Sequence, residues 1–157
     1  MNHSRRVFLK GAASVGVISM AAGAGLLTPA RVLANVWPTE AFDSDTVDGA
    51  MNALYDTTEA TPSEAIVIKA PDIAENGAVV PITIETDLAN VESITIIAQN
   101  NPAPLSAKFD FAANAKPYVS TRIKMGETSN VMALVKADGK IYSASKEVKV
   151  TIGGCGG

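Results

Sequence analysis

The chain has 157 residues, of which 47% are hydrophobic and 5% are aromatic, with a single cysteine, Cys155, and a single histidine, His3. This composition fits one globular domain preceded by a leader. Because His3 falls in the predicted leader, the rest of the chain has no Cys-His pair, no Ser-His-Asp triad and no imidazole metal ligand. The composition therefore argues against a self-contained enzyme, and we expect neither a cofactor nor a metal.

The leader is predicted over residues 1–34. A twin-arginine export pattern surrounds Arg5 and Arg6, and a small, apolar run follows as far as Leu27. Such a run is typical of a signal peptide, with cleavage expected after Ala34. We therefore predict export by the twin-arginine route, a periplasmic location and no membrane segment after cleavage.

Cleavage changes the charge of the protein. It removes four of the thirteen basic residues and no acidic residue, which takes the net charge from −3 to −7. A negative balance of this size argues against nucleic acid or an anionic membrane as partner. The basic residues are concentrated late in the chain, since residues 93–157 hold eight Lys or Arg and only four Asp or Glu.

The first predicted element is a short amphipathic helix that ends near Tyr55 and is capped by Ser44 or Asp45. Its apolar residues recur at helical spacing: Val47, Ala50, Met51 and Leu54. Asp43 and Asp48 lie near its start, where acidic side chains favour the helix dipole. We prefer this interpretation to a pair of catalytic carboxylates.

The remainder of the domain, residues 35–152, is expected to be mainly β. Alternating or β-branched apolar runs predict seven strands, over residues 65–70, 78–86, 91–99, 104–111, 118–125, 130–136 and 141–152. Residues 75–77 form a predicted turn, and Asp138-Gly139 predicts a tight hairpin turn. Pro81 places the second strand at an edge or a bulge. Short strands without long alternating helices indicate an immunoglobulin-like antiparallel β-sandwich.

The chain ends in Gly153, Gly154, Cys155, Gly156 and Gly157. A single cysteine has no partner in its own chain for a disulfide, so its chemistry must involve another molecule. Glycines without Cβ atoms allow the backbone to approach a second surface closely. Five extended residues span about 17 Å. We predict that residues 153–157 form a swinging arm that presents the Cys155 thiol; a disordered tail with an incidental cysteine is the alternative.

Several segments of the chain resemble SoxY, the sulfur-carrier family of the bacterial thiosulfate-oxidising Sox system. They are the twin-arginine leader and residues 74–81, 101–105, 122–125, 137–140 and 148–157. The resemblance implies an immunoglobulin-like fold and a heterodimer with a SoxZ-like subunit. It also implies that sulfur intermediates are attached covalently to Cys155, and that the chain itself is not an enzyme.

The same resemblance implies a series of partner enzymes. A SoxAX-like haem enzyme would join thiosulfate to the thiol, and a SoxB-like hydrolase would release sulfate. A SoxCD-like dehydrogenase, where one exists, would oxidise the remaining sulfur. Lys146 and Lys149 are candidates to favour the thiolate or to shield an anionic adduct, but the Gly157 carboxylate would oppose them, and we prefer to interpret them as ordinary strand-surface lysines.

Other classes of protein remain open at this point. A ubiquitin-like carrier would be activated as a thiocarboxylate at Gly157, which would make Cys155 secondary. A non-catalytic periplasmic β-sandwich would use the tail as a tether or a dimerisation handle. A metal chaperone is disfavoured because one soft ligand without histidine or a second cysteine makes a poor site.

Overall fold

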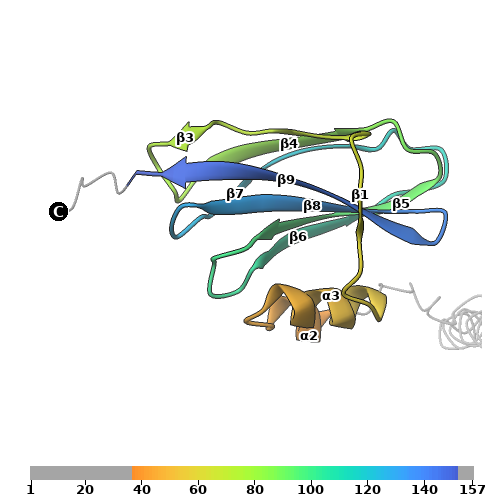
Figure 1. The fold of residues 1–157 in the computed structure, drawn as a ribbon. Helices are drawn as coiled ribbons and strands as arrows, with labels where there is room; N and C mark the ends of the chain where they lie inside the picture. Colours follow the sequence, from red (N-terminus) through yellow and green to blue (C-terminus); the bar gives the residue numbers. More distant parts are fainter. Residues whose placement is uncertain (1–36, 152–157) are drawn as a thin grey trace, which may run out of the picture. The chain divides into compact units, whose positions relative to one another are not determined.

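The computed structural model describes residues 37–151, and its helices and strands form a mainly β unit that begins at Pro38 (Figure 1). Two short helices come first, α2 (Thr39–Phe42) and α3 (Val47–Tyr55). Nine strands follow in this range: β1 (Thr61–Pro62), β2 (Ile66–Lys69), β3 (Ile73–Ala74), β4 (Val80–Thr86), β5 (Val91–Ala98), β6 (Leu105–Asp110), β7 (Tyr118–Ile123), β8 (Ser129–Ala137) and β9 (Lys140–Val150).

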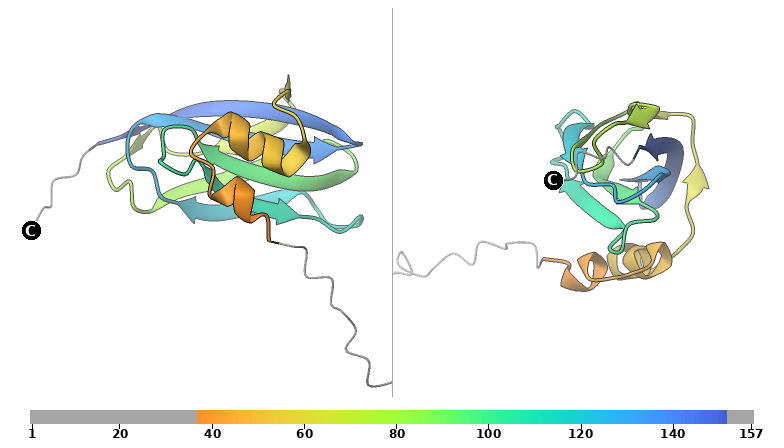
Figure 2. Two further views of the ribbon diagram at one scale, coloured as in Figure 1. Left: turned by 90° about the horizontal axis from the view of Figure 1, so that it is seen from below. Right: turned by 90° about the vertical axis from the view of Figure 1, so that its left-hand side faces the viewer.

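The strands form two sheets. The larger sheet has the order β1-β9-β8-β5-β6, with β3 also paired to β9, and the smaller has the order β2-β4-β7. Neighbours are antiparallel, except that β1 and β3 run parallel to β9. The view along the strands shows the sheets curving around a common interior (Figure 2). This architecture is the predicted immunoglobulin-like β-sandwich.

The interior is built from the alternating residues of both sheets. Ile82 and Ile84 of the smaller sheet and Ile94 and Ile96 of the larger sheet have no exposed surface. They belong to one cluster with residues from β7, β8 and β9, including Val148. Burying an aliphatic side chain of this size contributes about 1.5–3 kcal/mol, so the period-two pattern supplies the main driving force for pairing the sheets.

A second apolar cluster lies between the helices and the outer face of the larger sheet. Ile97 and Leu134 point away from the sandwich interior and are nevertheless fully buried. They pack against Ala50 and Met51 of α3 and against Ala41 of α2. The amphipathic face of α3 thus covers the centre of the larger sheet, as expected for a helix whose apolar residues recur every three or four positions.

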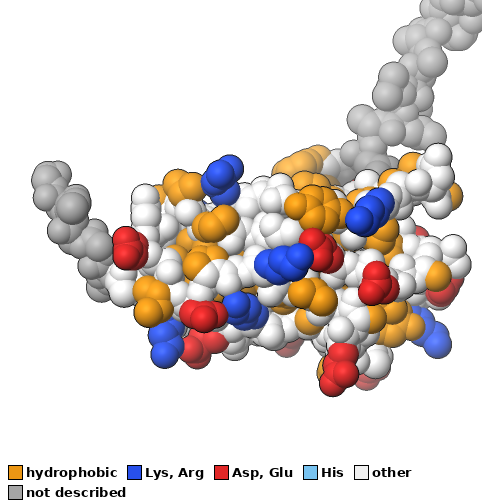
Figure 3. All heavy atoms as spheres, turned by 90° about the horizontal axis from the view of Figure 1, so that it is seen from above, with side chains coloured by type: hydrophobic (Ala, Val, Ile, Leu, Met, Phe, Trp, Pro, Cys, Tyr) orange, Lys and Arg blue, Asp and Glu red, His pale blue; other side chains and the backbone are white. Residues whose placement is uncertain are grey.

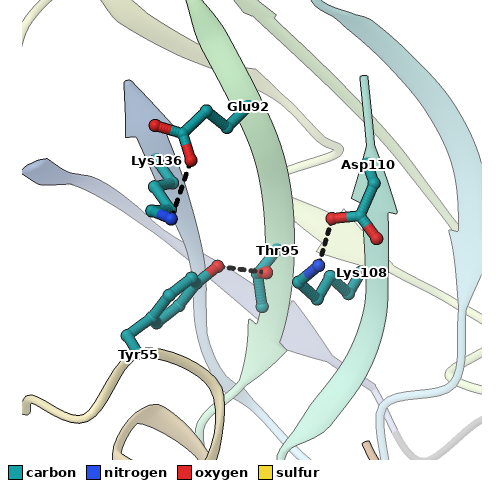
Figure 4. Close-up of polar contacts among 6 residues, drawn as sticks. All are labelled: Tyr55, Glu92, Thr95, Lys108, Asp110 and Lys136. Carbon is teal, nitrogen blue, oxygen red and sulfur yellow. Dashed lines mark hydrogen bonds and ion pairs between the residues drawn. The ribbon is translucent and has the colours of Figure 1, made fainter. Parts of the chain in front are cut away.

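Polar contacts hold α3 and the neighbouring strands in place (Figure 4). The Tyr55 hydroxyl, at the end of α3, lies 2.7 Å from Oγ1 of Thr95, which is fully buried on β5. Lys136 Nζ of β8 lies 2.7 Å from a carboxylate oxygen of Glu92 on β5. The Gly139 N–H also donates to Glu92, at 3.2 Å. Together these two donors, Lys136 foremost, hold the pKa of the Glu92 carboxyl below its usual range. The hydrogen bond to the Glu92 carboxylate in turn raises the pKa of Lys136.

The structure confirms the seven predicted strands to within two residues at each end and confirms the hairpin turn. Asp138 and Gly139 both have positive φ, 51° and 70°, as a two-residue type I′ turn requires. The short elements α2, β1 and β3 were not predicted, and β3 precedes the expected turn at residues 75–77. Pro81 lies in the central strand of the smaller sheet, not in an edge strand, but β2 pairs with β4 only from Thr83 onward. The missing N–H of Pro81 is therefore tolerated there.

The predicted helix cap was wrong by one residue. Thr46 is the N-cap of α3, because its backbone is extended and its hydroxyl accepts the Gly49 N–H at 3.1 Å. The Ser44 hydroxyl does not cap the helix, because it donates to the carbonyl of Thr46 at 2.9 Å. Of the nearby acids only Asp48 lies in the first turn of this helix.

Replacing Tyr55 by Phe tests the contact between α3 and the sheet. The variant leaves the buried Thr95 hydroxyl without its partner, so we expect a loss of about 1–2 kcal/mol in unfolding free energy, measured by urea denaturation. Adding Thr95→Val removes the orphaned group, and the double variant should recover part of the loss. Strictly additive effects of the two substitutions would contradict a direct hydrogen bond.

Replacing Glu92 by Gln tests the ion pair with Lys136. The pKa of the Glu92 carboxyl is lower in the folded chain than its value of about 4.5 in the unfolded chain. The ion pair therefore stabilises the native state fully at a pH above about 4.5, and this stabilisation is lost as the pH falls through the folded pKa. The denaturation midpoint of Glu92→Gln should therefore lie below the wild-type midpoint at neutral pH and converge with it in acid. Glu59→Gln, which removes an exposed glutamate with no ion pair among the described residues, should show no such pattern.

Candidate functional site

The sequence predicts a site at Cys155 with Gly153, Gly154, Gly156 and Gly157, and all five lie outside the described residues. The described part of the chain shows where this segment begins. Strand β9 ends at Val150, and Thr151 is the last described residue. The candidate site is therefore examined at this end of the sandwich.

The end of β9 is held from both sides. On the β8 side, the Thr128 hydroxyl accepts the Val150 N–H at 2.9 Å and donates to the Val150 carbonyl at 3.4 Å. On the β3 side, the Thr151 N–H donates to the Ala74 carbonyl at 3.1 Å. Val148, two residues earlier, is fully buried in the core. The segment that follows thus starts from a fixed point.

A close backbone contact lies beneath this end of β9. The Met125 N–H donates to the Gly77 carbonyl at 2.7 Å. A Cβ at residue 77 would lie 2.4 Å from the Met125 carbonyl oxygen and 2.8 Å from Cγ1 of Val150. Glycine is therefore required here by space, and the contact joins the loop before β4 to the loop after β7.

A basic depression of about 520 Å³ lies between β6 and β7 at the same end. Its lining includes Asn101, Ser106, Thr121, Arg122 and Lys124, and none of the lining residues within the described part of the chain is acidic. In the described part of the chain, neither Arg122 nor Lys124 forms an ion pair. Two unpaired cations in a concave site are suited to binding an anion.

One asparagine side chain shapes the wall of this depression. The Asn101 amide nitrogen donates to the Lys124 carbonyl at 2.7 Å, and its amide oxygen accepts the Gly126 N–H at 2.9 Å. Both ends of the amide are therefore used to tie the loop before β6 to the loop after β7. The basic residues of the depression are displayed on a braced loop.

The lysines proposed from sequence have different surroundings. Lys146 lies 3.0 Å from Asp72 and donates to the Ala70 carbonyl at 2.6 Å, so it is engaged along the strand. Lys149 is exposed on β9 and has no ion pair among the described residues. The contacts of Lys146 match the interpretation of an ordinary strand-surface lysine.

Other kinds of site were sought within residues 37–151. No group of three or more potential metal ligands occurs there. None of the helices in this range is long and apolar enough to cross a membrane.

The fold first defines the class of protein. The chain is an immunoglobulin-like β-sandwich protein, and its sequence continues beyond β9. A family model described as sulfur oxidation protein SoxY matches residues 51–155. The chain therefore belongs to the SoxY family. A search of curated proteins found no match.

Solved structures that are similar to this chain include a sulfur carrier and a superoxide reductase. The sulfur carrier protein SoxY from Chlorobium limicola f thiosulfatophilum is 44% identical, with a TM-score of 0.62, and the match covers 68% of this chain and 97% of that chain. The superoxide reductase (neelaredoxin) from Ignicoccus hospitalis is 16% identical, with a TM-score of 0.50, over 56% of this chain and 81% of that chain. The second likeness shows the fold alone.

The basic depression was not predicted from the sequence. A signal was present, because Arg122 and Lys124 alternate with the buried Ile123 and Met125 and must therefore share one face. Their position opposite Asn101 depends on the pairing of the sheets, which no local pattern reveals.

Replacing Gly77 by Ala tests the contact below the end of β9. The added Cβ would overlap the Met125 carbonyl, so we expect a loss of about 1–3 kcal/mol in unfolding free energy, measured by urea denaturation. Gly126→Ala is the matched control, because a Cβ there would meet only the Asn101 side chain, at 3.8 Å. Equal stability of the two variants would contradict the proposed spatial requirement.

Proposed function

We propose that this chain is a non-catalytic periplasmic carrier that holds intermediates of thiosulfate oxidation covalently on Cys155. The observation that carries the proposal is the extent of the family match, which reaches through residue 155 to the only cysteine of the chain. The relative of known structure that is 44% identical is itself a sulfur carrier protein.

The chemistry requires a thiol that is accessible to other proteins. Loading joins the Cys155 sulfur to the outer sulfur of thiosulfate, with release of one proton and two electrons, which a SoxAX-like haem enzyme would accept. Water then attacks the terminal sulfonate, with a SoxB-like hydrolase as catalyst. This step releases hydrogen sulfate and leaves a persulfide on Cys155.

The remaining sulfur can be oxidised while it stays attached. A SoxCD-like dehydrogenase would convert the outer persulfide sulfur to a sulfonate, taking its oxygens from water and passing the electrons onward. A second hydrolysis would release hydrogen sulfate again and regenerate the thiol. None of these steps requires a base or a metal from the carrier, which fits a mature chain that has no histidine.

The position of the attachment point supports this role. Val150 is hydrogen-bonded within the sandwich, so the residues beyond Thr151 determine how far the thiol can reach. Five extended residues span about 17 Å, enough to bring a sulfur atom into a neighbouring active site. Glycines on both sides of Cys155 keep the approach narrow, because they have no side chains.

The partners and the location belong to the same proposal. We expect a heterodimer with a SoxZ-like subunit and export of the folded chain by the twin-arginine route, followed by removal of residues 1–34. A ubiquitin-like carrier activated at Gly157 is disfavoured by the immunoglobulin-like fold and by the SoxY family model. A binding module would leave Cys155 unmodified.

The intact mass of the protein from the periplasm of thiosulfate-grown cells tests the proposal. We expect a chain that begins at Asn35 and carries sulfur-containing mass increments, which a reductant removes. Cys155→Ala should abolish all of these increments, because no other thiol is present. The variant should keep the wild-type denaturation midpoint, because residue 155 lies beyond the hydrogen-bonded end of β9.

The possible results separate the competing functions. An unmodified Cys155 in thiosulfate-grown cells would favour the binding module. A modification that survives Cys155→Ala and maps to the terminal carboxyl of Gly157 would favour the thiocarboxylate carrier. Recovery of the chain only from the cytoplasm would overturn the proposed location.

A further inference from the structure

We propose that the basic depression formed by Arg122, Lys124 and the Asn101 loop binds the terminal sulfonate of the adduct carried on Cys155. This inference rests on the proposed carrier function and adds a binding site for the carried group within the carrier itself. The ligand class is a small sulfur oxoanion, and the occupant is the chain's own segment 152–157 when it is loaded.

The depression and the end of β9 are linked through one loop. Thr128 contacts Val150 through its hydroxyl, and its carbonyl accepts the Asn100 amide at 3.0 Å. Asn101, next in the chain, lines the depression, as does Gly126, two residues before Thr128. In Figure 1 the end of β9 lies at the same end of the sandwich as the start of β6.

The required reach is short. Gly126 and Thr128 are two positions apart in the chain, so their Cα atoms are at most about 8 Å apart. Four residues lead from Thr151 to Cys155, and fully extended they span about 14 Å. A sulfur on Cys155 therefore reaches the rim of the depression without any movement of the sandwich.

The charges of the depression select an anion. Four other lysines of the described chain, Lys69, Lys108, Lys136 and Lys146, each form an ion pair with an acidic residue. Arg122 and Lys124 form none within residues 37–151, as is also true of Lys116, Lys140 and Lys149, although the mature chain is predicted to carry an excess of acidic residues. Arg122 and Lys124 differ from these three lysines because they line one depression together. On the face seen in Figure 3, by contrast, acidic and basic side chains are interspersed.

The donors also match a sulfonate. An arginine guanidinium can donate two parallel hydrogen bonds to an oxoanion, and a lysine adds a compact positive charge. Thr121 adds a hydroxyl to the lining. The volume of about 520 Å³ admits a sulfonate together with a narrow glycine-bearing segment. A neutral thiol or persulfide lacks the negative sulfonate, so the depression distinguishes sulfonated from unsulfonated states of the carrier.

The test uses the mature chain loaded in vitro with tetrathionate. The Cys155 thiolate attacks one inner sulfur of tetrathionate, forms a new S–S bond and releases thiosulfate, so that an outer sulfonate remains on the protein. Intact mass verifies complete loading. The double variant Arg122→Gln/Lys124→Gln removes both charges, and Lys116→Gln/Lys140→Gln is the matched control, because both of these exposed lysines lie toward the opposite end of the strands.

Two measurements follow loading. Backbone amide resonances of Arg122 and Gly126 should shift in the wild type and in the control variant, and should stay unchanged in Arg122→Gln/Lys124→Gln. Removal of the adduct by a neutral thiol should be slower in the wild type than in the double variant, by about tenfold if the bound sulfonate contributes about 1.4 kcal/mol.

Titration of free thiosulfate into Cys155→Ala separates the two sources of the oxoanion. Shifts of the same resonances that need millimolar thiosulfate would support the site, with the attached group favoured by its high effective concentration. Complete loading without shifts at Arg122 and Gly126, or equal shifts in the double variant, would overturn the inference. Such a result would leave the carrier function intact, because that function is judged by adducts on Cys155 in cells.

Discussion

Strand β9 is the element on which both the core and the candidate site depend. It pairs along its length with β8, and on its other side with β1 near Tyr142 and with β3 near Val150. Its residue Val148 is fully buried between the sheets. Because the same strand closes the core and leads to the cysteine-bearing segment, the position of the attachment point is set by hydrophobic packing.

This arrangement separates stability from chemistry. The clusters around Ile82 and Ile96, and around Met51 and Leu134, account for the sandwich and its helical cover. The proposed reactive group follows β9 in the sequence, and every described residue of these clusters precedes it. A carrier built in this way can present chemically different adducts to several enzymes while its folded unit stays the same.

Much of the fold could be predicted because several strands alternate between buried and more exposed residues, and others are rich in β-branched apolar residues. β4 shows this plainly, with Val80, Ile82 and Ile84 buried in turn. The short strands β1 and β3 could not be predicted, because each has two residues and exists only through pairing with distant β9. Pro81 was expected at an edge or a bulge because the sequence around it does not reveal that the pairing of β2 with β4 begins only at Thr83.

The candidate site likewise has one part that the sequence reveals and one part that it does not. A lone cysteine between glycines is a local signal, and it was recognised from the sequence, although its place lies beyond the described residues. The basic depression is assembled from the Asn101 loop, β6, and β7 with the loop that follows it. Only the pairing of the sheets brings these segments together, so their combination had no signature along the chain.

The pairing of β9 also has a mechanical consequence. A force applied to the C-terminal segment in the direction of β9 is transmitted along that strand. The nine positions paired between β8 and β9 then resist together in shear, and the parallel contacts with β3 share the load near the point of attachment. Such a force must break the hydrogen bonds between β8 and β9 together, and it does not separate the two strands one residue after another.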